Sequence, residues 1–198
     1  MTERILIAGA DIETTGLEQT EGHRIIEIAI GIYDLATQAK VGAYVTRINP
    51  QRSIDPKAQE VHGIAFEDLV SAPLWEDVAP KVSAILSRCK YAVMHNGEGF
   101  DAPFIYGELL RAGQALPELG VVDTMLQARW ATADGNVPNL GALCFACGVP
   151  YDPSKAHGAL YDVEVMVQSF FSQFSRGFFQ LPTTPYRYTV PKPRKEKK

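Results

Sequence analysis

Two carboxylates stand on either side of Ile12 near the start of the sequence. Asp11 and Glu13 follow an apolar run over residues 5–10 and precede a Thr-Thr-Gly turn. On an extended segment, residues two apart point to the same side, so we expect both carboxylates on one face and Ile12 in the core. Their charges repel each other unless a cation lies nearby, and Mg²⁺ prefers such oxygen ligands. The pair predicts a divalent-cation site; the alternative is a strand end that opens into a polar turn.

A third acid, Asp101, stands where an apolar strand gives way to a helix. It closes the stretch His-Asn-Gly-Glu-Gly-Phe-Asp, which follows residues 91–94 and opens a helix expected over residues 102–112. Open α/β sheets commonly bind ligands at such junctions. Asp101 can also be the N-cap of that helix, because aspartate accepts hydrogen bonds from the first backbone N–H groups. The two roles are compatible, since a capping carboxylate can also face a metal ion.

A histidine and a fourth acid, His157 and Asp162, stand five residues apart. This spacing does not stack them within a regular helix, but a loop histidine and an acid in the first helical turns can reach one site. Histidine has an ordinary pKa of about 6.5, so His157 can take a proton from an attacking water near neutral pH. The alternative is that His157 caps or packs locally and Asp162 lies on the helix surface.

The elements that carry these residues alternate in a recognisable order. Three consecutive strands, then helix, strand, helix, strand and helix, predict an α/β fold with a mixed five-stranded sheet flanked by helices. The expected strands cover residues 5–10, 24–34, 41–49, 91–94 and 121–123. Short helical turns are expected at 55–58 and 66–69, and helices at 75–89, 102–112, 124–131, 140–146 and 158–174.

Length and charge predict one acidic domain with a basic end. The 198 residues suffice for one domain, which we assign to residues 1–180. Residues 181–198 are rich in Pro, Lys and Arg and are expected to form a basic, disordered tail. Six bases and one acid stand in residues 187–198, so this end carries +5 and the rest −9 of the formal charge of −4. An acidic body can still hold a phosphate backbone where bound cations neutralise its carboxylates.

The three cysteines do not indicate a disulfide framework. Cys144 and Cys147 form a CxxC without a second pair, so we expect them inside a helix rather than at a zinc or redox site. No signal pattern and no apolar run of membrane-spanning length is present in the sequence, which favours a cytoplasmic protein without membrane contact.

The order of the three motifs resembles one family. Asp-x-Glu-Thr-Thr-Gly, His-Asn-Gly-x-x-Phe-Asp and His-x-Ala-x-x-Asp resemble the DEDD exonuclease superfamily, in the subgroup with a histidine in its third motif. The resemblance runs from about residue 5 to residue 174 and includes Val-His-Gly-Ile at 61–64 and Asp-Thr at 123–124. The second motif is one residue longer than in the proofreading subunits of replicative polymerases and looks more like the TREX group of DNA exonucleases.

This resemblance implies a ribonuclease H-like fold and a two-metal 3′–5′ exonuclease that releases nucleoside 5′-monophosphates. By resemblance, Asp11, Glu13 and Asp162 hold one Mg²⁺, and Asp11 bridges to a second Mg²⁺ near Asp101, with Mn²⁺ as a substitute. His157 becomes the base that takes a proton from water. Two such cations can stabilise the attacking and the leaving oxygen of an in-line displacement.

Six further residues are expected at the terminal nucleotide: Thr14, Thr15, Gly16, Leu17, His62 and Asn96. The turn would offer backbone N–H groups and an apolar contact to the base. Two alternatives remain open: His62 fixes its own loop, and Asn96 orients the loop that bears Asp101. We interpret His23 and His95 as ordinary polar residues and Phe100 as core.

The motifs leave the substrate and partners open. DNA 3′ ends are favoured, and the alternatives are an exoribonuclease of the same fold or a non-catalytic nucleic-acid or polymerase-associated module. A homodimer and a polymerase or repair partner are further expectations from the family. The basic tail either adds attraction for a phosphate backbone or is a solvated end without function.

Overall fold

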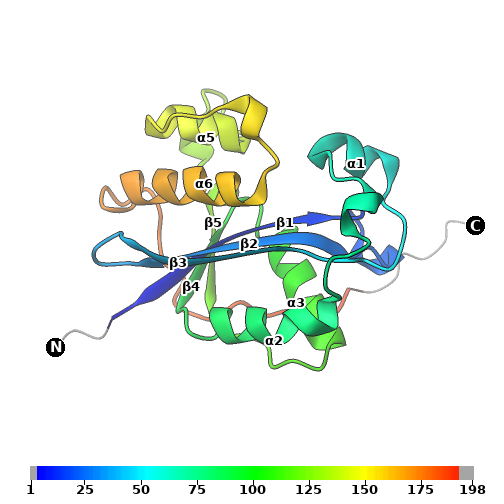
Figure 1. Ribbon diagram of the computed structural model, residues 1–198. Coiled ribbons are helices and arrows are strands. Elements are labelled where there is room, and N and C mark those ends of the chain that lie inside the picture. The colour runs from blue at the N-terminus through cyan, green and yellow to red at the C-terminus, as the bar shows by residue number, and fades with distance from the viewer. Residues whose placement is uncertain (1–3, 192–198) are drawn as a thin grey trace, which may run out of the picture.

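The computed structural model describes residues 4–191 and has a five-stranded mixed sheet (Figure 1). The strands are β1 (Leu6–Thr14), β2 (Ile25–Asp34), β3 (Lys40–Arg47), β4 (Tyr91–Met94) and β5 (Gly120–Asp123). Their spatial order is β3-β2-β1-β4-β5. The first three strands pair antiparallel, and β1, β4 and β5 run parallel. The sheet confirms the predicted fold class.

Helices and short 3-10 segments connect and cover the strands. The helices are α1 (Pro56–His62), α2 (Trp75–Leu86), α3 (Asp101–Arg111), α4 (Thr124–Gln127), α5 (Leu140–Cys147) and α6 (Ala159–Phe174). The 3-10 segments are η1 (Gln19–Glu21), η2 (Phe66–Leu69), η3 (Arg129–Ala131) and η4 (Pro153–Lys155). Within residues 4–191, no helix has the length and apolar character needed to cross a membrane.

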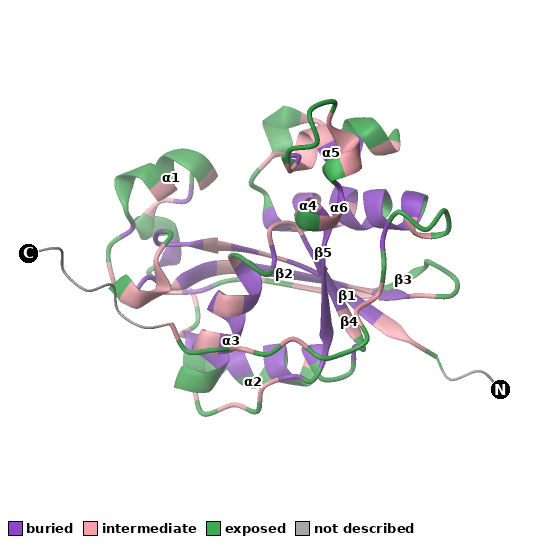
Figure 2. Ribbon diagram, turned by 180° about the vertical axis from the view of Figure 1, so that it is seen from behind, coloured by how far each residue is buried: buried purple, intermediate pink, exposed green. Residues whose placement is uncertain are grey.

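The sheet lies between two layers of helices. α2 and α3 pack on one face and α5 and α6 on the other (Figure 1), while α1 stands largely exposed at the end of the sheet (Figure 2). Successive residues of β1 alternate between the layers: Ala10 and Ile12 pack toward α2 and α3, and Ile7 packs toward α6. Asp11 and Glu13 therefore share the α6 face, as the alternation predicts.

Two differences from the predicted elements concern site residues. β1 continues to Thr14, so Asp11 and Glu13 lie within the strand, because pairing with β2 extends to its end. Asp101 is the first residue of α3, and Phe100 occupies the N-cap position that we expected for Asp101. Elsewhere the predicted helix over 124–131 is divided into α4 and η3.

Paired glycines bring α6 close to the sheet. Gly9 of β1 lies opposite Gly31 of β2, and a β-carbon at Gly9 would overlap Val167 of α6. A β-carbon at Gly31 would come within 3.1 Å of Val163, also on α6. The absence of side chains at these two positions therefore sets how near α6 approaches β1 and β2.

Residues 181–191 form no regular secondary structure but pack on the domain. Leu181 joins the core between the sheet and α6, and the backbone N–H of Tyr186 donates to the carbonyl of Leu119 at 2.8 Å. Tyr186 and Tyr188 pack against Tyr106 of α3. The prediction that disorder begins at residue 181 is wrong for this segment, because its tyrosines bury apolar surface. The rest of the predicted tail, residues 192–198, lies outside the described residues.

Candidate active site

A pocket of about 550 Å³ opens where β1 and β4 end, beside α1 and the first turn of α3. All four predicted carboxylates and His157 line it, although they come from residues 11 to 162 of the chain. Its lining residues are Asp11, Ile12, Glu13, Thr14, Gly16, Leu17, Glu18, Glu21, His23, Asp55, Lys57, Ala58, Val61, His62, His95, Phe100, Asp101, His157 and Asp162.

The carboxylates repel one another and are shielded from water. Burial raises the pKa of Asp11 well above its usual range, and the charges of Asp101 and Glu13 raise it further. Burial and the nearby Glu27 raise the pKa of Glu13 to about 8. Burial also raises the pKa of Asp101 to about 7, against the hydrogen bonds from its own N–H and that of Ile12. Within residues 4–191, none of the four acids forms an ion pair.

One carboxylate oxygen of Asp162 accepts a hydrogen bond from the described residues, and the other does not. Its Oδ2 accepts a hydrogen bond of 2.8 Å from the backbone N–H of His157, whereas its Oδ1 is buried and has no hydrogen-bond partner in the described part of the chain. An unsatisfied buried carboxylate oxygen is costly, and a bound cation would remove that cost. The residues present therefore fit a divalent metal. No three His, Cys, Asp or Glu side chains among residues 4–191 already form a coordination sphere, so ligand roles remain proposals.

His157 stands in a strained loop before α6. Its φ is 62°, in the left-handed region that non-glycine residues seldom adopt, and its side chain is exposed beside the pocket. The hydrogen bond from its backbone N–H to Asp162 stabilises this conformation. The loop thereby holds the imidazole next to the carboxylates while leaving both ring nitrogens free of a hydrogen bond to the described residues.

The predicted nucleotide-binding residues divide into two groups. Thr14, Gly16, Leu17 and His62 line the pocket, whereas Thr15 and Asn96 do not. The hydroxyl of Thr15 accepts a hydrogen bond from the N–H of Arg24, and its own N–H donates to the Arg24 carbonyl, so both groups are occupied inside the turn. The Asn96 carbonyl accepts hydrogen bonds from the N–H groups of residues 99 and 100, contacts that fit the alternative of orienting the loop before Asp101.

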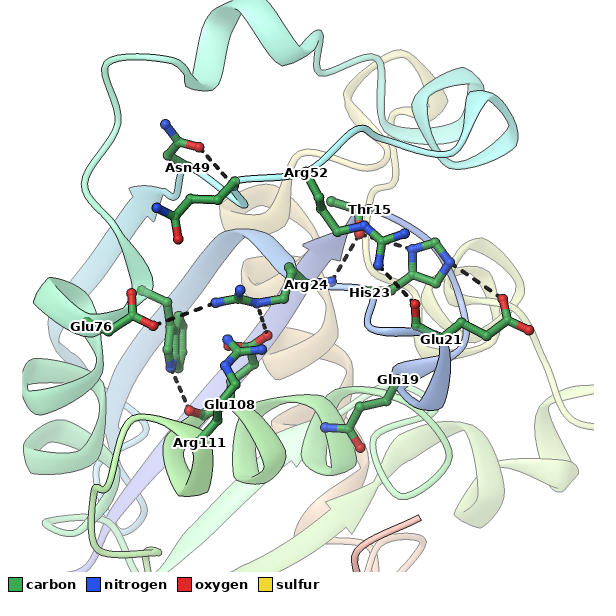
Figure 3. Close-up of polar contacts among 12 residues, drawn as sticks. Thr15, Gln19, Glu21, His23, Arg24, Asn49, Arg52, Glu76, Glu108 and Arg111 are labelled. Atoms are coloured by element: carbon green, nitrogen blue, oxygen red, sulfur yellow. Dashed lines mark hydrogen bonds and ion pairs between the residues drawn. The ribbon is translucent and has the colours of Figure 1, made fainter. Parts of the chain in front are cut away.

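His23 packs against the turn that follows β1. Its Nδ1 lies 3.0 Å from the hydroxyl of Thr15 (Figure 3), and its ring lies so near Gly16 that any β-carbon there would overlap it. The next residue, Arg24, donates to the buried carboxylate of Glu108 on α3 at 2.8 Å. Gly16 is thus required by the close approach of His23, and the turn is tied to the helix that begins at Asp101.

His62 of α1 lines the pocket, and its ring is held by its own loop. Its Nδ1 accepts the N–H of Ile64 at 3.0 Å, so the neutral ring carries its proton on Nε2, which is buried without a hydrogen-bond partner in the described chain. Burial lowers the pKa of His62 and so favours this neutral form. The ring therefore fixes its own loop, which was one of the two alternatives that the sequence left open, and it also lines the pocket. Its contact with the substrate stays a prediction.

Several pocket residues escaped the sequence interpretation. Val61 on α1 is 56% exposed and lines the same pocket as Leu17, which is 76% exposed. The Val-His-Gly-Ile segment was the only signal for Val61. His95, which we interpreted as an ordinary polar residue, lines the pocket, and its Nδ1 lies 3.0 Å from the hydroxyl of Thr124. Phe100 also lines the pocket while packing on Phe104. Of these residues only His95 directly follows a strand, β4, and that position was the available signal for it.

The two cysteines of the CxxC lie on α5, as predicted. Cys144 is buried and its sulfur lies 3.6 Å from the hydroxyl of Ser169, and Cys147 is half-buried. Burial raises the pKa of both thiols, which disfavours the thiolate that metal binding and redox exchange require. Their surroundings therefore agree with the structural role expected from the sequence.

The exonuclease family model RNase T matches residues 9–170, from β1 into α6. The chain belongs to this exonuclease family. The match confirms the enzyme class that the motifs predict, a 3′–5′ exonuclease, and divalent-metal dependence is general in the family. It also spans every carboxylate of the pocket.

Two curated relatives of this exonuclease are polymerase subunits. DNA polymerase III subunit epsilon of Rickettsia felis is 34% identical over 165 residues, which cover 81% of this chain and 70% of the relative. The same subunit of Escherichia coli K12 is 31% identical over 171 residues, 82% of this chain and 68% of the relative.

Solved structures confirm the ribonuclease H-like fold. Escherichia coli exonuclease I bound to single-stranded DNA superposes with a TM-score of 0.73 at 17% identity, over 88% of this exonuclease but only 41% of exonuclease I. Exonuclease X in complex with 5′ overhanging duplex DNA superposes with a TM-score of 0.63 at 24% identity, over 86% of this chain and 93% of that protein. The fold is thus shared both with part of a longer nuclease and with a nuclease of similar size.

Proposed function

We propose that this exonuclease removes nucleotides from DNA 3′ ends and releases nucleoside 5′-monophosphates. The observation that carries the proposal is the gathering of Asp11, Glu13, Asp101, Asp162 and His157 around one pocket. DNA is favoured over RNA because the curated relatives are DNA polymerase subunits and the two superposed nucleases were solved with DNA.

The four carboxylates would hold two divalent cations, Mg²⁺ by preference and Mn²⁺ as a substitute. Asp11, Glu13 and the unsatisfied Oδ1 of Asp162 share the α6 side of β1, and Asp101 faces them from α3. When bound, such cations neutralise phosphate charge and make water a better nucleophile. Without them, burial and mutual repulsion raise the pKa of these acids.

His157 would take the proton of the attacking water on an imidazole nitrogen. The water oxygen attacks phosphorus, and the bond that breaks joins phosphorus to the 3′ oxygen of the penultimate nucleotide. The 3′ oxygen leaves with the bonding electrons and takes a proton from solvent water, and the exposed ring returns its own proton to solvent. Its fixed backbone keeps the ring at the pocket, so the base is in place before the substrate arrives.

The terminal nucleotide would lie between the turn after β1 and helix α1. Leu17 and Val61 offer exposed apolar side chains to the base, and Gly16 lets the backbone approach the sugar. The Nε2–H of His62 can donate to an oxygen of that nucleotide. None of these groups distinguishes a sugar with a 2′ hydroxyl, so the same pocket would also accept an RNA end.

A polymerase or repair partner is proposed from the curated relatives, which are named as subunits of DNA polymerase III. The homodimer and the cytoplasmic location stay predictions from the sequence.

The test is digestion of 5′-labelled single-stranded DNA and RNA of the same sequence, with Mg²⁺, with Mn²⁺ and with EDTA. We expect a ladder that shortens from the 3′ end of DNA and requires a metal. Asp101→Asn serves as the control, because it removes one ligand charge and leaves the shape of the side chain. A faster ladder on RNA would replace the substrate assignment, and intact strands of both kinds would point to the non-catalytic module.

A further inference from the structure

The loop over residues 148–158 carries His157 and joins α5 to α6 (Figure 1). It contains the short 3-10 segment η4 and ends at Gly158, the N-cap of α6. The imidazole of His157 stays beside the carboxylates only as long as this loop keeps its conformation. The contacts that hold the loop therefore bear on the chemistry of the pocket, although most of them lie outside it.

Two backbone N–H groups of the loop are bound by neighbouring side chains of α6. The N–H of Asp152, at the start of η4, donates to the hydroxyl of Tyr161 at 2.5 Å. The N–H of His157 donates to Oδ2 of Asp162 at 2.8 Å. Because Tyr161 and Asp162 are consecutive residues in the first turn of α6, one turn of one helix fixes both ends of the segment 152–157.

The segment between these two hydrogen bonds is held together by its own contacts. Oδ1 of Asp152 accepts hydrogen bonds from the N–H and the hydroxyl of Ser154, at 3.0 and 2.7 Å. The N–H of Lys155 donates to the carbonyl of Asp152 at 3.0 Å, and the N–H of Gly158 donates to the carbonyl of Lys155 at 3.2 Å. A hydrogen bond at Asp152 therefore restrains His157 as well, through a segment that is itself stiff.

The ring of Tyr161 is also a packing surface for the loop. The ring of Tyr151 lies 6.0 Å from it between centroids, and Nζ of Lys155 lies 5.9 Å from its centroid. Tyr151 in turn packs on Gly141 of α5, where a β-carbon would come within 3.1 Å of its ring. Tyr161 itself is not among the described residues that line the active-site pocket, so its contacts concern the loop and not the substrate.

The two hydrogen bonds respond differently to a bound metal. Oδ1 of Asp162 is a ligand in the proposed function, and a carboxylate that shares its charge with a cation is a weaker hydrogen-bond acceptor. The hold of Asp162 on the His157 N–H should therefore weaken when metal is bound. The Tyr161 hydroxyl is neutral and outside the pocket lining, so its bond to Asp152 does not depend on the metal.

We propose that Tyr161 is a positioning residue for His157. Its hydroxyl holds the loop through Asp152 and keeps the imidazole at the pocket while Asp162 serves the metal. The inference rests on the proposed function, in which His157 takes the proton of the attacking water. It assigns a part in the reaction to a side chain that touches neither metal nor substrate.

The first test removes the hydroxyl and keeps the ring. Tyr161→Phe should lower kcat on single-stranded DNA by about tenfold, since one hydrogen bond changes the population of the held loop by about that factor. KM and the affinity for Mg²⁺ should stay those of the parent, because Tyr161 does not line the pocket. Tyr151→Phe is the matched control: it takes a hydroxyl from the stacked ring of the same loop, leaves both N–H contacts in place and should behave as the parent.

A double-mutant cycle separates positioning from general damage to the fold. If Tyr161 acts through His157, adding Tyr161→Phe to His157→Ala should lower kcat no further. A readout without metal or substrate is amide hydrogen exchange in EDTA, where the His157 N–H should exchange about tenfold faster in Tyr161→Phe than in the parent. A further loss of kcat in the His157→Ala background would overturn the proposal, and so would unchanged exchange at His157.

The proposed function and this inference fail in different ways. If the parent hydrolysed no DNA, or if His157→Ala kept the turnover of the parent, the proposed roles would fail and the inference with them. Hydrolysis that depends on His157 but is the same in Tyr161→Phe as in the parent would overturn the inference alone.

Discussion

At the scale of single residues, His157 combines an unusual backbone with an exposed ring. Its left-handed φ and its hydrogen bond to Asp162 hold the loop, while the imidazole contributes nothing to the core. We expect His157→Ala to fold and bind metal as the parent does, and to lose two to four orders of magnitude in turnover, about the value of one general base. Single-turnover hydrolysis and metal titration would measure the two effects; turnover equal to that of the parent would remove His157 as the base.

Gly16 is a second residue of the pocket, and no side chain fits at its position. A β-carbon there would overlap the His23 ring, so Gly16→Ala should displace the turn. This should raise KM for a small substrate that fills only the pocket, the p-nitrophenyl ester of thymidine 5′-monophosphate, by about tenfold, with a smaller effect on stability. Gly42→Ala is the matched control, because its nearest neighbour would be 3.6 Å away. Combining Gly16→Ala with His23→Ala should recover part of the loss, and no recovery would rule out the steric explanation.

At the scale of elements, Asp123 joins three segments around the pocket. It is buried at the end of β5, and its oxygens accept the N–H groups of Glu98, Met125 and Leu126. It therefore caps α4 and pins the loop that leads to Asp101. Asp123→Ala should lower the free energy of unfolding by about 2 to 4 kcal/mol in urea titrations, since charged hydrogen bonds and a cap are lost together. Asp134→Ala, which removes a similar turn on the exposed surface, should cost under about 1 kcal/mol.

The sequence predicted the elements better than the contacts between them. Alternation along β1 was enough to place Asp11 and Glu13 on one face. For Asp162 the sequence predicted only that an acid in the first helical turns can reach the same site as a loop histidine, and the structure has both side chains at the pocket. Thr15 could not be placed, because its hydroxyl is bound by Arg24, a contact set by how β2 returns beside β1. His95 was missed because one side chain at a strand end gives no periodic signal.

The last described segment, residues 181–191, shows the limit of composition as a guide to structure. Residues 181–191 contain the prolines and the arginine that are typical of disorder, and the prediction followed them. Tyr186 and Tyr188 hold this segment to the domain, because they pack on Tyr106 of α3. That aromatic surface exists only once the domain has folded. Local sequence cannot reveal such a surface, since it is formed by residues about eighty positions away.

At the scale of the whole molecule, the pocket makes stability depend on pH and metal. Asp101 and Glu13 have ordinary pKa values of 3.8 and 4.5, which the fold raises to about 7 and about 8. Between these values the folded protein holds protons that the unfolded chain has released. The contribution of the two protonated carboxyl groups to the free energy of unfolding is therefore fully present below about pH 4 and is lost as pH rises through 7 to 8. In EDTA, the free energy of unfolding should fall from pH 5 to pH 8, and Mg²⁺ should remove most of that slope.

Urea titrations at several pH values, with and without Mg²⁺, would measure this dependence. Glu13→Gln should flatten the EDTA profile and raise stability at pH 8, even though it should abolish hydrolysis. A profile in EDTA that does not decline toward pH 8 would show that the carboxylates are already compensated in the metal-free protein.

Gly9 and Gly31 face the underside of α6, and neither lines the pocket. They nevertheless determine the distance between β1 and Asp162, because a methyl group at Gly9 would overlap Val167 of α6, and one at Gly31 would press on Tyr33 and Val163. A screen for loss of activity would therefore be expected to return substitutions at these two glycines alongside the acids. Such substitutions would act through the distance between helix and sheet and not through a chemical group, and a smaller residue in place of Val167 should restore activity to a variant at Gly9.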